Sequence, residues 1–119
     1  MTLTQPQCEA FADVLVLAMC IDGHFSLLEE EAIQKKIDSI GWNENLSPSI
    51  HIGSSIARAR DVAGSPEEVR IYLEKVTAVF DEPATARFVL DETVKVLESD
   101  GTSVDEGVFT AQLKSILKL

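Results

Sequence analysis

The segment that most constrains the fold lies near the N-terminus, where an unbroken run of eight apolar residues extends from Val14 to Ile21. This run is far shorter than the roughly 20 apolar residues that a membrane-spanning helix needs. A helix with apolar side chains on every face packs against neighbours on several sides. We therefore expect a helix from about Pro6 to Ile21 at the centre of an all-helical domain.

The remaining chain shows helical periodicity in five further segments, and no segment shows sustained alternation of apolar and polar residues. These predicted helices cover about residues 26–40, 47–63, 65–80, 83–97 and 105–117. A serine precedes a proline at residues 47–48 and 65–66, an arrangement typical of helix starts, and residues 65–68 have the form of a capping box. The residues predicted to face inward are Ile33, Ile37, Ile40, Ile52, Ile56, Ala59, Ala63, Val69, Tyr72, Leu73, Val76, Phe80, Ala86, Leu90, Val94, Leu97, Phe109, Leu113 and Ile116. Short connections between such helices predict one compact all-α bundle over residues 1–119.

The charge of the chain is strongly acidic, with a formal net charge of −10, which disfavours binding to nucleic acid. Residues 1–34 carry six acids and no Lys or Arg, and residues 81–119 carry eight acids against four bases. No basic leader precedes the apolar run, and Cys8 and Cys20 lie too far apart on one helix to form a disulfide. We therefore expect a cytoplasmic protein with reduced thiols and no transmembrane segment.

A helix–Asp-Gly–helix unit occurs twice, at the two ends of the chain. The first copy contains "CIDGHFSLLEEE", residues 20–31, and the second contains "ESDGTSVDEGVF", residues 98–109. In each copy an apolar helix runs into Asp-Gly, a short polar step comes next, and the following helix starts with acidic residues. Asp22 therefore corresponds to Asp100, and the pattern predicts a helical hairpin at each end of the bundle.

The two Asp-Gly turns have a structural interpretation and two metal-binding interpretations. In the structural one, glycine ends a helix, and Ser26 with Glu29 and Ser103 with Glu106 form capping boxes. An EF-hand is excluded, because its first ligand positions would be occupied by Ala18 and a cysteine. The third interpretation is a cation site shared by both turns, which suits Ca²⁺ or Mg²⁺ because these ions prefer oxygen ligands. Its candidate ligands are Asp22, Glu29, Glu30, Asp100, Asp105 and Glu106.

With these features, the chain resembles the TerB-like family of tellurite-resistance proteins. The resemblance lies in "VLVLAMCIDGHFSLLEEEAIQKKIDSIGW", residues 14–42, and "RFVLDETVKVLESDGTSVDEGVFTAQLKSILKL", residues 87–119. A related module resembles the cytoplasmic N-terminal part of a membrane-tethered DnaJ-like co-chaperone. The resemblance implies a single helical domain with a pseudo-repeat, a metal-binding role for the acidic turns, and a link to chemical-stress responses. The implied ligands are Asp22, Asp100 and Glu29, and the second-copy counterpart of Glu29 is either Asp105 or Glu106.

Other catalytic or metal-binding patterns are absent from the sequence. The two histidines, His24 and His51, form no His-x-x-x-His pair, and there is no Cys-x-x-Cys, phosphate-binding glycine loop or nucleophile elbow. Arg58 and Arg60, with Lys35 and Lys36, are expected to pair with neighbouring carboxylates, and Trp42 is expected at the edge of the core. We predict a non-enzymatic cytoplasmic binding module that holds a divalent cation at its turns and engages protein partners in a stress response. The alternative is a ligand-free interaction or scaffold domain in which the turns are only structural caps.

Overall fold

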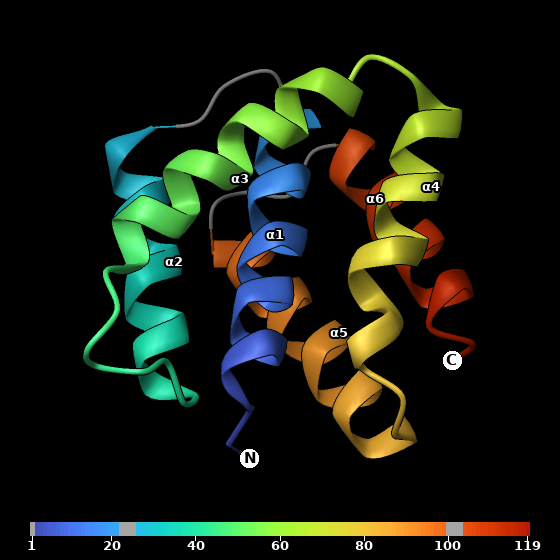
Figure 1. The fold of residues 1–119 in the computed structure, drawn as a ribbon. Helices are drawn as coiled ribbons and strands as arrows, with labels where there is room; N and C mark the ends of the chain where they lie inside the picture. Colours follow the sequence, from blue (N-terminus) through green and yellow to red (C-terminus); the bar gives the residue numbers. More distant parts are fainter. Residues whose placement is uncertain (1, 22–25, 100–103) are drawn as a thin grey trace.

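The computed structural model describes residues 2–21, 26–99 and 104–119, and all regular structure in these ranges is helical (Figure 1). The elements are α1 (Gln5–Ile21), α2 (Leu27–Ser39), α3 (Pro48–Val62), α4 (Pro66–Val76), the short 3-10 helix η1 (Thr77–Val79), α5 (Pro83–Ser99) and α6 (Val104–Ile116). The prediction of an all-α bundle is confirmed. None of the helices in these ranges is both long and apolar enough to cross a membrane.

Helix α1 lies at the centre of the bundle, with the other helices arranged around it (Figure 1). Every residue from Ala10 to Met19 is buried, and α1 contacts each of the other five α-helices. A helix surrounded in this way needs apolar side chains on all of its faces, which is the pattern predicted from the sequence. The N-terminal helix is therefore the element around which the bundle packs.

The inward-facing residues predicted for the other helices lie in or against the core. The buried ones are Ile33, Ile37, Ile40, Ile52, Ala59, Val69, Leu73, Phe80, Ala86, Leu90, Leu97, Phe109 and Leu113. The half-buried ones are Ile56, Ala63, Tyr72, Val76, Val94 and Ile116. Helix α4 ends earlier than predicted, at Val76, and its inward stripe continues to Phe80 through η1.

Of the four predicted serine caps, Ser103 lies outside the described residues, and the other three differ in their hydrogen bonding. Ser26 and Glu29 form the predicted capping box, because each side chain accepts a hydrogen bond from the other residue's backbone N–H. Ser65 accepts the Glu68 backbone N–H, but the return bond is missing because the Ser65 N–H donates to Val62. Ser47 occupies the cap position of α3 and makes no side-chain capping bond. The prediction of a full capping box at Ser65 was therefore wrong, although the helix start was placed correctly.

The C-terminal end of α2 is hydrogen-bonded to the N-terminal segment of the chain. The backbone N–H of Leu3 donates to the Ile40 carbonyl over 2.7 Å, and Gly41 comes next with a φ of 125°. Trp42, the residue after it, is 8% exposed and donates its indole N–H to the Leu46 carbonyl over 2.8 Å. The prediction that this tryptophan closes the edge of the core is confirmed.

Candidate functional site

Most of the predicted cation ligands lie outside the described part of the structure. Asp22 and Asp100 fall in the two undescribed segments, and the side chains of Asp105 and Glu106 on the first turn of α6 are likewise not described. His24 also falls in the first of these segments. Among the side chains that are described, no group of three or more His, Cys, Asp or Glu residues has the geometry to hold a metal ion.

Two predicted ligands, Glu29 and Glu30, lie in the described part of the structure on the first turn of α2, and Glu30 is half-buried there. Glu29 makes specific contacts. Its side chain is buried, and one carboxylate oxygen accepts the Ser26 backbone N–H over 2.9 Å. The Ser26 hydroxyl accepts the Glu29 backbone N–H over 3.2 Å in return. These bonds satisfy backbone groups at the start of α2, so the structure assigns Glu29 a capping role.

The helices that flank the two Asp-Gly turns pack against each other. Ile21, the last residue of α1, lines a cavity of about 160 Å³ together with Val108 and Phe109 of α6. Figure 1 shows the C-terminal end of α1 and the start of α6 on the same side of the bundle. The helix that leads into the first turn therefore ends beside the helix that comes after the second turn.

A cluster of ionisable groups that was not predicted joins α1 to α3. One carboxylate oxygen of Asp13 lies 2.9 Å from Nε2 of His51 and accepts a hydrogen bond from the Arg58 guanidinium over 3.1 Å. The same His51 nitrogen lies 3.1 Å from the Glu9 carbonyl oxygen. Since both neighbours of Nε2 are acceptors, this nitrogen carries the proton. The Asp13 side chain is only 12% exposed, and its charge is balanced by Arg58, whose predicted pairing with a carboxylate is confirmed.

The electrostatics of this cluster follow from burial and from the Asp13 charge. The hydrogen bond that His51 donates to Asp13 raises the pKa of His51, although burial acts in the opposite direction. Burial raises the pKa of the Tyr72 phenol, and the Asp13 charge raises it further. The hydroxyl oxygens of Tyr72 and Ser55 are buried, and neither makes a hydrogen bond of standard geometry within the described residues. The cluster therefore favours a charged imidazole and a neutral phenol.

An open groove of about 660 Å³ passes over this cluster between α1, α3 and α4. Its lining residues are Pro6, Glu9, Ala10, Asp13, His51, Arg58, Asp61, Val62, Tyr72, Lys75 and Val76. The volume lies in the range of small-molecule pockets, roughly 300–1,000 Å³. Within the described residues, His51 makes no hydrogen bond to a hydroxyl or thiol. Its contacts with Asp13 and with the Glu9 carbonyl hold α3 against α1.

Sequence reasoning missed the Asp13 cluster although one signal pointed to it. Asp13 is the one charged residue in the otherwise apolar segment from Ala10 to Ile21. A carboxylate on a central helix must be buried, and a buried carboxylate requires cationic or hydrogen-bonding partners. The sequence therefore held the evidence for a buried ion pair, but it did not identify the partners on α3.

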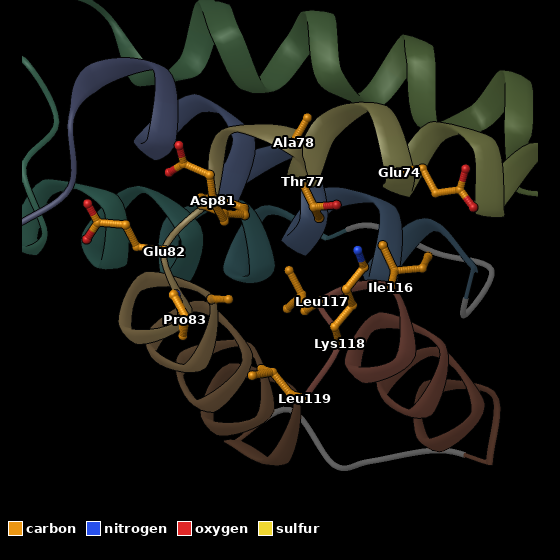
Figure 2. Close-up of a pocket in the computed structure, with 12 residues that line it drawn as sticks. Glu74, Thr77, Ala78, Asp81, Glu82, Pro83, Ile116, Leu117, Lys118 and Leu119 are labelled. Carbon is orange, nitrogen blue, oxygen red and sulfur yellow. The ribbon is translucent and has the colours of Figure 1, made fainter.

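A further cavity of about 400 Å³ lies where η1 and the start of α5 face the end of α6. Figure 2 shows Asp81 and Glu82 on one side of it and Glu74 on the other, with Lys118 between them. Asp81 and Glu82 directly precede Pro83, at the start of α5, where the helix dipole stabilises negative charge. Glu74 pairs with Arg70 over 2.7 Å. The carboxylates around this cavity thus have structural roles.

Comparison of this chain with protein-family models, with curated proteins and with solved structures finds no match. The TerB-like resemblance therefore stays a prediction that depends on the two repeated segments. The structure itself shows an all-helical bundle whose two terminal hairpins are in contact.

Proposed function

We propose that this chain is a non-enzymatic, TerB-like helical binding module of the cytoplasm, which holds a divalent cation at its two acidic Asp-Gly turns and binds protein partners in a stress response. The cation is Ca²⁺ or Mg²⁺, because the available ligands are carboxylate and carbonyl oxygens. The observation that supports this proposal is the contact between the end of α1 and the first turns of α6.

This contact joins the two helix ends that border the Asp-Gly turns in the sequence. Ile21 immediately precedes Asp22, and α6 begins three residues after Gly101. The segment that carries Asp22 thus starts at the end of α1, and the segment that carries Asp100 ends at the start of α6, a neighbour of α1. Carboxylates gathered from two such segments repel one another, and a bound cation removes that repulsion.

Exposed apolar residues near these helix ends support the protein-binding part of the proposal. Leu27 and Leu28, on the first turn of α2, are 77% and 78% exposed, and Val108 on α6 is 66% exposed. Contiguous exposed apolar side chains mark surfaces for protein partners, and Leu27 and Leu28 are adjacent on α2. These residues flank the turns that are proposed to hold the cation.

Isothermal titration calorimetry on chelator-treated protein tests the cation site with Ca²⁺, Mg²⁺, Mn²⁺ and Zn²⁺. We expect a binding heat that disappears in the double variant Asp22→Asn, Asp100→Asn. The matched control is Asp38→Asn, Asp91→Asn, which removes the same charge from exposed positions on α2 and α5 and should retain the heat. Thermal denaturation verifies the fold of each variant. A heat that survives in the first double variant contradicts the proposed ligands.

A ligand-free scaffold domain is the second candidate, and the capping box at Glu29 is the observation that favours it. A carboxylate that accepts a backbone hydrogen bond at a helix start has a sufficient structural role without a metal. In this case Glu29→Ala lowers the free energy of unfolding by about 1 kcal/mol whether or not chelator is present. If the calorimetric titrations give no binding heat for any of the four ions, the ligand-free scaffold domain is favoured over the cation site.

A further inference from the structure

We infer that His51 is a pH-controlled latch, which holds the first turn of α3 against α1 when it is charged and releases that turn when it becomes neutral. Nε2 of His51 lies 2.9 Å from the Asp13 carboxylate and 3.1 Å from the Glu9 carbonyl oxygen. We call these three groups the His51 latch. The inference goes beyond the proposed function, because it requires neither the cation site nor a protein partner.

The charged and titratable groups that face His51 come from α1, α3 and α4. They are Glu9, Asp13, Arg58, Asp61, Tyr72 and Lys75. The hydrogen bond to Asp13 raises the pKa of His51 most, burial lowers it, and the Asp13 charge raises it again. On the opposite side of the ring, the lining residues that precede α3 are Trp42, Leu46 and Ser47, which carry no charge.

Two cations of α3 share one oxygen of Asp13, and only one of them titrates near neutral pH. The Arg58 guanidinium lies 3.1 Å from the same oxygen that His51 contacts. A guanidinium keeps its charge in proteins, whereas an imidazole changes charge between about pH 5 and 8. When His51 becomes neutral, Arg58 therefore still balances the Asp13 carboxylate and keeps the middle of α3 on α1. The ionic attraction is lost only at the start of α3.

The first turn of α3 has few other restraints. Ser47 makes no side-chain capping bond, and Ser49 and Ile50 are exposed, the latter at 77%. Within the described residues, His51 is the first residue of α3 whose side chain hydrogen-bonds to α1. Segments with few buried side chains and exposed backbone open locally before the whole domain unfolds. The turn from Pro48 to His51 is therefore the segment that depends on the His51 latch.

The His51 ring also contacts Trp42, in the segment before α3. The two ring centroids are 5.8 Å apart, and the ring planes are inclined at 54°. A hollow of about 360 Å³ on this side is lined by Trp42 and Ile50, and His51 lines both this hollow and the groove of about 660 Å³. His51 thus lies between the two openings, and release of the latch would join them.

A pH titration of chelator-treated protein measures the charge of the latch. The proton NMR signal of the His51 ring, identified by its absence in His51→Gln, gives the pKa of His51. The fluorescence of Trp42, the single tryptophan, should rise with the same midpoint, because a neutral imidazole quenches an indole less than a charged one. The matched control His24→Gln removes the other histidine and should retain this transition, which His51→Gln abolishes.

Native-state hydrogen exchange measures the release itself. Each helical amide pairs with the carbonyl four residues earlier, so the amides of Ile52 and Gly53 report on the turn that begins at Pro48, and Ala59 reports on the middle of α3. Above the pKa of His51, the protection factors of Ile52 and Gly53 should fall about tenfold for each unit by which that pKa exceeds about 6.5. Low urea should leave their exchange unchanged, because a local opening exposes little surface, and should accelerate exchange at Ala59.

The presence of chelator lets the latch and the cation proposal fail separately. A pH-dependent loss of protection at Ile52 and Gly53 that is insensitive to urea supports the latch even if no cation heat is found. Protection that stays constant across the His51 titration, or that responds to urea as Ala59 does, overturns the latch even if the cation site is confirmed. His51→Gln should show no pH-dependent loss, and the parent alone decides the outcome if that variant does not fold.

Discussion

Gly41 occupies a position that only glycine fits, and Gly41→Ala is expected to destabilise the bundle strongly. Its φ of 125° lies in the region that side chains other than glycine rarely adopt. A Cβ added there would lie 2.4 Å from the Leu3 carbonyl oxygen, which is backbone and cannot rotate away. The Leu3 segment must therefore move, and its hydrogen bond to Ile40 is put at risk.

The magnitude of the loss combines these two effects. Holding an L-residue at this φ costs about 1–3 kcal/mol. Losing the hydrogen bond between the Leu3 N–H and the Ile40 carbonyl costs about 0.5–1.5 kcal/mol more. Together they lead us to expect that Gly41→Ala lowers the free energy of unfolding by about 2–4 kcal/mol. For a domain of this size the melting temperature should fall by about 10 °C.

Urea denaturation measures this change with two independent signals. Circular dichroism reports on the whole bundle, and the fluorescence of Trp42, the single tryptophan and the next residue in the chain, reports on the affected turn. Coincident transitions from the two signals would establish that the domain unfolds in one step, as a single free energy of unfolding requires.

The matched control is Gly53→Ala, because a Cβ at this exposed position of α3 meets no atom within 4 Å. There the same chemical change should raise stability by about 0.5–1 kcal/mol, since alanine favours the helix. The change in the free energy of unfolding should thus have opposite signs in the two variants. A Gly41→Ala protein as stable as the parent would refute the reasoning from φ and close approach.

Three further predictions concern single groups. The hydrogen bond to Asp13 raises the pKa of His51, so the stabilisation that the charged imidazole gives the fold is fully present below about pH 6.5 and is lost as pH rises through the higher folded-state pKa. Across that window the free energy of unfolding of the parent should fall relative to that of His51→Gln. Parallel curves of unfolding free energy against pH for the two proteins would contradict this. Lys118 has a φ of 62° at the end of α6, so Lys118→Gly should raise the free energy of unfolding by about 1 kcal/mol in urea denaturation, and a loss of stability would disprove the strain. Cys8 is buried with a pKa raised to about 11 by burial, so alkylation followed by mass spectrometry should modify half-buried Cys20 first, and faster labelling of Cys8 would contradict the core packing.

The sequence by itself determined the helices and their inward faces, because both depend on interactions between near neighbours. Serine-proline pairs marked the starts of α3 and α4, and the 3.6-residue period identified stripes such as Ile33 and Ile37. The apolar run after Asp13 also indicated which helix lies at the centre. Where a local rule failed, as at Ser65, a competing backbone bond only a few residues away was responsible.

Only the tertiary structure decided which distant residues meet. Asp13 contacts His51 and Arg58 across 38 and 45 residues of chain, and no local pattern encodes that pairing. The same holds for the cavity between Ile21 and Phe109, which arises because the two terminal hairpins pack around one shared core. Periodicity fixes the face that a helix buries, whereas the neighbour on that face depends on how all six helices fill space together.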